Sequence, residues 1–201
     1  VLDNIQTTEA TNAAGIFDGH SYENEKVNNL HLTLKNSHVS GSIFTRDILK
    51  SNTTWNGSDS RITIEDSTIM NSHAEIIAEV STNSDTATSS ILIQRSHITG
   101  NKNGAILVSY ANDSVASINV TESTISGNMA EIIAFASVDN GAANIDVTKS
   151  NISENIARHI ADSYSAYGSA SINMTESSVN VNTILSDGLI TSGKVANIIN
   201  I

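Results

Sequence analysis

Short runs of alternating hydrophobic and polar residues recur along this chain. The clearest examples are Ile118-Asn119-Val120, Ile145-Asp146-Val147 and Ile172-Asn173-Met174. Alternation with a period of two places the hydrophobic side chains on one face of a β-strand and the polar ones on the other. β-branched residues suit a pleated sheet, and no copy keeps a helical period over about 11 residues. The pattern predicts an all-β protein.

These runs belong to an internal repeat that covers most of the chain. Six copies align, beginning at Leu30, Arg61, Ser90, Ser117, Asn144 and Ser171. With Ile118 as the anchor, the equivalent residues are Leu32, Ile62, Ile91, Ile145, Ile172 and Ile199, in steps of 30, 29, 27, 27, 27 and 27. Each copy contains a strand, a tight turn, a second strand, another turn and a longer β segment.

A unit of this size cannot bury its hydrophobic face alone, so the copies must stack and share one core. Stacking at the strand spacing of about 4.8 Å turns equivalent residues into columns. We therefore expect a right-handed parallel β-helix of about six to seven coils of 27–30 residues, forming a single domain over residues 1–201. Residues 1–29 are expected to form an irregular or partial first coil, with Gly15-Ile16-Phe17 in its third strand.

Four columns support the stacking. A serine column comprises Ser37, Ser67, Ser96, Ser123, Ser150 and Ser177. An aliphatic column comprises Val39, Ile69, Ile98, Ile125, Ile152 and Val179. A polar column, in which stacked amides are expected to hydrogen-bond between coils, comprises Ser42, Ser72, Asn101, Asn128, Asn155 and Asn182. A column whose charge alternates from Asp66 onward comprises Asn36, Asp66, Arg95, Glu122, Lys149 and Glu176, and predicts an exposed series of ion pairs.

Composition narrows the possible partners. The chain has 10 Lys and Arg against 21 Asp and Glu, for a net charge of −11, which argues against nucleic acid. It contains no Cys, which excludes disulfides and thiolate metal sites. No run approaches the ~20 apolar residues of a membrane-spanning helix, so we expect the chain itself not to be membrane-embedded.

The motifs INVTESTISGN, from Ile118, and IEDSTIMNS, from Ile64, resemble those of bacterial autotransporter adhesin passenger domains, within the pectin-lyase-like superfamily. The resemblance covers residues 30–201. It implies an extracellular segment, displayed on the outer membrane, that binds a host cell-surface glycan or an extracellular-matrix protein, or associates with copies of itself between cells. It also implies that the chain is a fragment of a longer passenger.

The third β segment of each copy leaves one question open. If Ala78 and its equivalents face inward, then Ile77, Ile106, Ile133 and Ile160 form an exposed stripe near Phe135, Tyr110 and Tyr164. Such a stripe would mark an interaction surface. Alternatively, a bulge turns the isoleucines inward and ejects Glu79 and Asp162. The residues predicted to bind a ligand are Ile77, Ile106, Ile133, Ile160, Phe135, Tyr110, Tyr164 and, in a non-repetitive loop, Trp55.

β-Helices also host polysaccharide-degrading lyases and hydrolases, so the fold alone leaves an enzyme, or a passive stalk, as alternatives. A hydrolase needs two carboxyl groups about 5–10 Å apart. The acidic candidates Asp66, Glu122 and Glu176 are spread singly along the repeat, with Lys149 between the last two, as ion pairing requires. We therefore predict no catalytic residues and no cofactor.

Metal binding finds little support. His38 and His97 share a column, but Thr68 lies between them, which leaves about 10 Å from coil to coil and is too far for one zinc ion. Calcium at Asn112-Asp113 or Asp139-Asn140 is the remaining option, without the glycine-rich repeat of calcium-binding β-rolls. We predict no metal site.

Overall fold

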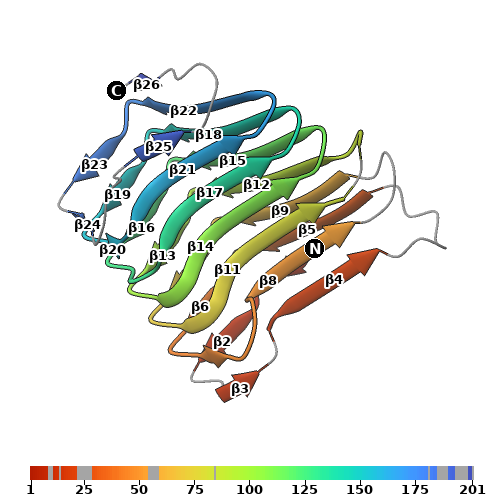
Figure 1. Ribbon diagram of the computed structural model, residues 1–201. Coiled ribbons are helices and arrows are strands. Elements are labelled where there is room, and N and C mark those ends of the chain that lie inside the picture. Colours follow the sequence, from red (N-terminus) through yellow and green to blue (C-terminus); the bar gives the residue numbers. More distant parts are fainter. Residues whose placement is uncertain are drawn as a thin grey trace.

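A computed structural model describes residues 1–8, 11–13, 15–21, 29–53, 59–83, 85–180, 182–184, 190–192 and 199–200. These residues form a parallel β-solenoid of about six turns, as the repeat predicted (Figure 1). The described part of the chain contains no helix long and apolar enough to cross a membrane.

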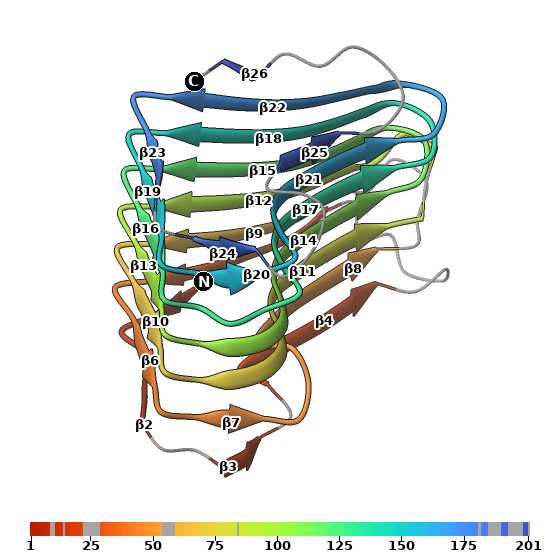
Figure 2. The same cartoon turned by 60° about the vertical axis from the view of Figure 1, so that its left-hand side comes forward.

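Three sheets form the walls of the solenoid (Figure 2). Sheet A contains β1 (Leu2–Asp3), β5 (Asn29–Lys35), β9 (Asp59–Glu65), β12 (Thr88–Gln94), β15 (Val115–Thr121), β18 (Ala142–Thr148), β22 (Ser169–Thr175) and β26 (Ile199–Asn200). Sheet B contains β2 (Gln6–Thr8), β6 (His38–Ser40), β10 (Thr68–Met70), β13 (His97–Thr99), β16 (Thr124–Ser126), β19 (Asn151–Ser153) and β23 (Ser178–Asn180).

Sheet C is built from the longer β segments. Its strands are β3 (Thr11–Ala13), β4 (Phe17–Ser21), β7 (Ile43–Phe44), β8 (Leu49–Thr53), β11 (His73–Thr82), β14 (Lys102–Ala111), β17 (Ile132–Val138), β21 (His159–Ser165) and β25 (Ile190–Ser192). A short pair, β20 (Ile156–Ala157) with β24 (Thr183–Ile184), precedes β21 and β25. Residues 1–21 contribute β1 to β4, so the first coil has strands in all three sheets, and Phe17 pairs with Leu49 in sheet C.

The observed register matches the sequence repeat. Ile118 pairs with Ile91 on one side and with Ile145 on the other, and Ile172 pairs with Ile199. The aliphatic column of sheet B pairs in the same way, from Val39 to Val179. From Ile62 to Ile172, the isoleucines of both columns are almost completely buried and point into one continuous core along the axis.

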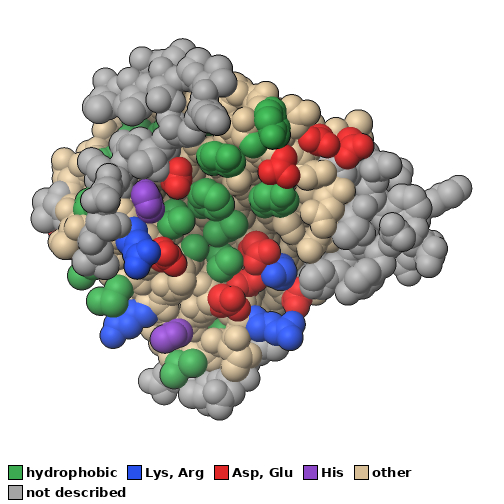
Figure 3. All heavy atoms as spheres, in the orientation of Figure 1, with side chains coloured by type: hydrophobic (Ala, Val, Ile, Leu, Met, Phe, Trp, Pro, Cys, Tyr) green, Lys and Arg blue, Asp and Glu red, His purple; other side chains and the backbone are tan. Residues whose placement is uncertain are grey.

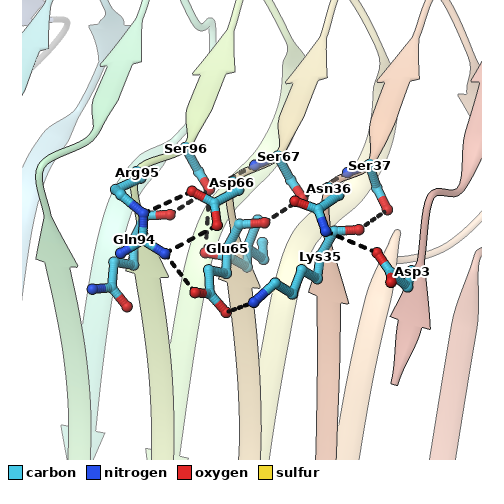
Figure 4. Close-up of polar contacts among 11 residues, drawn as sticks. Asp3, Lys35, Asn36, Ser37, Glu65, Asp66, Ser67, Gln94, Arg95 and Ser96 are labelled. Atoms are coloured by element: carbon cyan, nitrogen blue, oxygen red, sulfur yellow. Dashed lines mark hydrogen bonds and ion pairs between the residues drawn. The ribbon is translucent and has the colours of Figure 1, made fainter.

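The side chains of the serine column hold the turn between sheets A and B through hydrogen bonds. The residue before each serine has a positive φ, such as 49° at Glu122. The chain reverses there, so the backbone N–H of Ser96 donates to Ser123 Oγ at 3.1 Å, while Ser123 Oγ donates to Thr121 O at 2.7 Å. The same two bonds recur from Ser37 to Ser150, and Figure 4 shows three of these serines. Serine is required because its short hydroxyl both accepts from the neighbouring coil and donates within its own.

Charged side chains at this turn pair where the signs alternate, as predicted for part of the column. Arg95 binds Asp66 at 2.7 Å and Glu65 at 2.5 Å, and Lys35 also reaches Glu65 at 3.2 Å (Figure 4). The Arg95 guanidinium, chiefly through its hydrogen bond, lowers the pKa of Asp66. Further along, Lys149 lies 4.0 Å from Glu176.

The second turn, between sheets B and C, is held by the predicted asparagine column. The backbone N–H of Asn101 donates to Asn128 Oδ1 at 3.0 Å, and Asn128 Nδ2 donates to Ile98 O at 2.9 Å. Asn155 repeats both bonds one coil further on. Asn101, Asn128 and Asn155 are fully buried, so these amides satisfy backbone groups that water cannot reach.

Candidate functional site

The isoleucine column of sheet C faces the core. Ile77, Ile106, Ile133 and Ile160 are each 0 % exposed. The prediction of an exposed stripe made of these four residues is therefore wrong, and they cannot contact a ligand directly. Alternation breaks at this point in each of the four coils: Ile77 and Ala78, for example, are buried in succession, and Glu79 is turned outward to a partly exposed position. The isoleucines therefore face inward and Glu79 and Asp162 face outward, which agrees with the alternative prediction, although the register between coils is unchanged.

The same break brings a different set of apolar side chains to the outer face of sheet C. We call this set the apolar stripe, and it consists of Ile76, Ala105, Val108, Tyr110, Ile132, Phe135 and Tyr164. All seven are partly or fully exposed, and Tyr164 is 43 % exposed. Figure 3 shows hydrophobic side chains gathered over β11, β14, β17 and β21, with charged side chains around them.

Strand pairing places these residues in three adjacent columns. Ile76, Ala105 and Ile132 are paired in one column, and Val108 pairs with Phe135 in the next. Tyr110 and Tyr164 lie two coils apart in the third, with Ser137 between them. Three of the predicted binding residues, Phe135, Tyr110 and Tyr164, therefore lie on the outer face, as the sequence had suggested. Trp55 lies outside the described residues.

The outer faces of the other two sheets are polar. The middle outward column of sheet A comprises Thr63, Leu92, Asn119, Asp146 and Asn173. One outward column of sheet B comprises Ser40, Met70, Thr99, Ser126, Ser153 and Asn180. Leu92 and Met70 are single apolar residues among polar neighbours. Within the described ranges, an apolar and aromatic surface occurs on sheet C alone.

A group of ionisable side chains borders the apolar stripe on the side of the earlier coils. Lys50 Nζ lies 3.2 Å from Asp47 Oδ2 and 2.9 Å from Glu79 Oε2. Asp47 is 5 % exposed, and its other oxygen, Oδ1, has no hydrogen-bond partner among the described residues. Burial raises the pKa of Asp47 to about 7, the hydrogen bond and negative charge of Glu79 add to the rise, and Lys50 opposes it. Asp47 therefore keeps its proton up to near neutral pH, beside the side chain of Glu79.

On the opposite edge of sheet C, Tyr110 meets acidic residues of the next coil. Its hydroxyl donates to Asp139 Oδ2 at 3.5 Å. Partial burial, followed by the charge of Asp139, raises the pKa of Tyr110. The tyrosine therefore stays neutral and keeps a hydroxyl at the rim of the stripe.

A groove runs along the corner where the turn from sheet B enters sheet C. We call it the corner groove; its volume is about 440 Å³, and it is lined by His73, Lys102, Asn103, Met129, Ala130, Glu131 and Arg158. A smaller adjoining hollow is lined by Glu75, Ile76, Gly104, Ala105, Glu131 and Ile132. Ile76, Ala105 and Ile132 thus belong both to this hollow and to the apolar stripe.

The other candidate groups do not form a site of their own. Asp66 is held by Arg95 and Glu176 lies beside Lys149, while strand pairing puts Thr68 between His38 and His97 as expected. Among the residues that the structure describes, no three His, Asp or Glu side chains come close enough to hold a metal ion.

Neither the Asp47–Lys50–Glu79 group nor the corner groove was predicted from the sequence. Asp47 and Lys50 lie in the least repetitive part of the chain, so no column pointed to them. The groove combines residues from different coils, and only the register, with His73 beside Lys102 and Lys102 beside Met129, could have assembled them.

Because comparisons with known proteins found no match, the function has to be argued from the fold and from these surfaces. No protein-family model, curated protein or solved structure matches the chain.

Proposed function

We propose that this chain is an extracellular adhesin segment, displayed on a bacterial outer membrane, whose sheet C presents a flat binding face. Its partner is a host cell-surface glycan or an extracellular-matrix protein, or a second copy of the chain on another cell. The observation that carries the proposal is the one-sided distribution of exposed apolar and aromatic residues over sheet C. Exposed patches of this kind mark interaction surfaces, whereas singly scattered apolar residues do not.

The physical character of the stripe suits recognition. Parallel strands hold its side chains about 4.8 Å apart between coils, so Tyr110 and Tyr164 present two rings about 9.6 Å apart on a rigid frame. Aromatic side chains lose little conformational entropy on binding and supply both an apolar face and a hydroxyl. The net charge of −11 argues against nucleic acid as the partner.

Binding of the purified chain to an array of glycosaminoglycans, other glycans and matrix proteins tests the proposal, with sedimentation to detect self-association. A double variant, Phe135→Ser/Tyr164→Ser, removes two aromatic rings from the stripe without adding charge. We expect it to reduce binding to whichever partner the wild type captures by about tenfold or more, since aromatic anchors commonly contribute more than about 1 kcal/mol each.

Thr121→Ala/Thr148→Ala is the matched control, since both threonines point outward from sheet A. It should bind as the wild type does, and both double variants should keep the β-sheet circular dichroism signal. Equal binding by the wild type and the folded Phe135→Ser/Tyr164→Ser variant would show that the stripe is not the binding face. A chain that binds nothing on the array and does not self-associate would favour a passive stalk.

A polysaccharide-degrading enzyme is the second candidate, and one observation favours it. Asp47 and Glu79 are a carboxyl pair in which one pKa is raised to about 7, as general acid catalysis requires. Against it, Lys50 bridges the two groups and Asp47 is almost wholly covered. Release of reducing or unsaturated sugar ends from polysaccharides by the wild type, and its loss in Asp47→Asn, would establish the enzyme.

A further inference from the structure

The hollow that adjoins the corner groove owes its shape to small side chains in the middle of three coils. Gly104 and Ala105 lie between the coil that carries Glu75 and Ile76 and the coil that carries Glu131 and Ile132. Because Gly104 lacks a side chain and Ala105 has only a methyl group, the surface sinks there. Ile76 and Ile132 then face each other across the hollow, two strand spacings or about 9.6 Å apart.

Lys102 supplies an uncommitted positive charge at this groove. In the described ranges, every other Lys or Arg side chain makes an ion pair or, for Arg61, a hydrogen bond to Ser90. Lys102 alone does neither, and its side chain is exposed beside that of His73. An unpaired cation in a chain with a net charge of −11 is available to an anionic ligand.

The other walls of the groove offer contacts for a sugar. Met129, which is 48 % exposed, together with Ile76 and Ile132 provides apolar surface for the C–H groups of a pyranose ring. Glu75 and Glu131 provide carboxylate oxygens that accept hydrogen bonds from hydroxyl groups. Asn103, which also lines the groove, is fixed in place because its Nδ2 donates to Ala74 O at 3.1 Å.

The balance of charges selects the type of anion. Arg158 is already held by Glu131 at 3.2 Å, so Lys102 is the one free full positive charge among the described residues of the groove. Two carboxylates, Glu75 and Glu131, border the same space and would repel a phosphate dianion more strongly than a singly charged group. A single carboxylate matches one ammonium group, and sugar hydroxyls match the two acids.

We propose that the corner groove binds a carboxylated sugar residue, with the carboxylate on Lys102 and the ring against Met129 and the hollow over Ala105. The proposal deepens the binding role of sheet C and rests on it. The groove is open and contains one free charge, so we expect a dissociation constant in the millimolar range for a single sugar, with tighter binding when several residues of a glycan are engaged.

Titration of the ¹⁵N-labelled chain with sodium D-glucuronate tests this assignment. Shifts are expected at the backbone amides of Lys102, Gly104 and Glu131. D-Glucose should bind at least about tenfold more weakly, because it lacks the carboxylate, and sodium acetate similarly, because it lacks the ring. Lys102→Met should weaken glucuronate binding about tenfold or more.

Two further variants make the result decisive. Ala105→Phe fills the hollow without changing the charge and should also abolish binding, whereas Lys149→Met removes a lysine elsewhere on the surface and should leave binding unchanged. The proposal is overturned if glucuronate causes no shifts at these amides, if glucose or acetate binds equally well, or if folded Lys102→Met retains wild-type affinity. Failure here would leave the apolar stripe untouched, since the Phe135→Ser/Tyr164→Ser comparison tests that surface separately.

Discussion

At the scale of single residues, Asp47 is the clearest example of an ionisable side chain in an unfavourable, buried environment. Its carboxyl group is almost wholly buried, and Lys50 compensates only part of the loss of water because it also binds Glu79. The folded protein therefore holds a proton on Asp47 up to a pKa of about 7, whereas an aspartate in the unfolded chain loses it near pH 3.8.

This difference predicts a pH-dependent stability. Between about pH 4 and pH 7 the folded state binds more protons than the unfolded state, so stability falls as the pH rises through this window. We expect the Asp47 contribution to the free energy of unfolding to drop by roughly 2–4 kcal/mol from about pH 4 to about pH 8.

Urea unfolding of the wild type and of Asp47→Asn at each pH measures this contribution. The amide that replaces the carboxyl group cannot ionise, so the variant should lack this part of the pH dependence. It should therefore gain stability relative to the wild type as the pH rises, and the gain should be largest at about pH 8. Parallel pH profiles for the two proteins would contradict the assignment.

Single residues also show which features could be predicted from the sequence and which could not. The serine and asparagine columns were visible because their function repeats in every coil, so identical residues appear at identical spacing. Asp47 and Lys102 have no such repetition. Lys102 is aligned with His73 and Met129, and nothing in that column signals that its charge is left without a partner among the described residues.

At the scale of the element, the strands of sheets A and B were predictable and those of sheet C were predictable only in part. In sheet A, alternation is unbroken and fixes which side chains face inward. In sheet C, two successive residues, Ile133 and Ala134, both face the core, so a period of two cannot assign the residues on either side. The reason is geometric: strands of sheet C curve where they enter the sheet (Figure 2), and successive side chains on the inner side of such a bend can both reach the core.

Two adjacent isoleucines in β17 test this geometry. Ile133 is completely buried and Ile132 is partly exposed. Ile133→Glu would place a carboxylate in the core, at a cost of several kcal/mol, and should prevent folding or lower the melting temperature by more than about 10 °C. Ile132→Glu should fold with a change of about 1 kcal/mol or less.

Thermal melts followed by circular dichroism distinguish the two variants. Similar melting temperatures for Ile132→Glu and Ile133→Glu would show that the bend is misplaced. A reversal of their order would restore the isoleucine column of Ile77, Ile106, Ile133 and Ile160 as an outer surface.

At the scale of the whole molecule, stability is carried from coil to coil, because each coil contacts only its neighbours. The continuous connections are the core, the three sheets and the two side-chain columns at the turns. Asn128 lies in the middle of one column: its Oδ1 accepts from the backbone N–H of Asn101, and its Nδ2 donates to Ile98 O.

Asn128→Ala should therefore weaken one junction between coils. It leaves the buried N–H of Asn101 and the side-chain amide of the same residue without their acceptor, which is expected to cost about 2–5 kcal/mol. Hydrogen exchange measures which backbone amides lose stability. Amides around the turn from β13 into β14 and from β16 into β17 should exchange faster, and the most distant coils should change least.

Ser126→Ala, on the outward face of β16, is the control and should leave exchange unchanged. Equal acceleration at every coil would mean that the solenoid opens as one cooperative unit. In that case the corner groove and the apolar stripe would be held by the stability of the entire stack. A local response would mean instead that the four coils from β11 to β21, which carry both binding surfaces, keep them in shape.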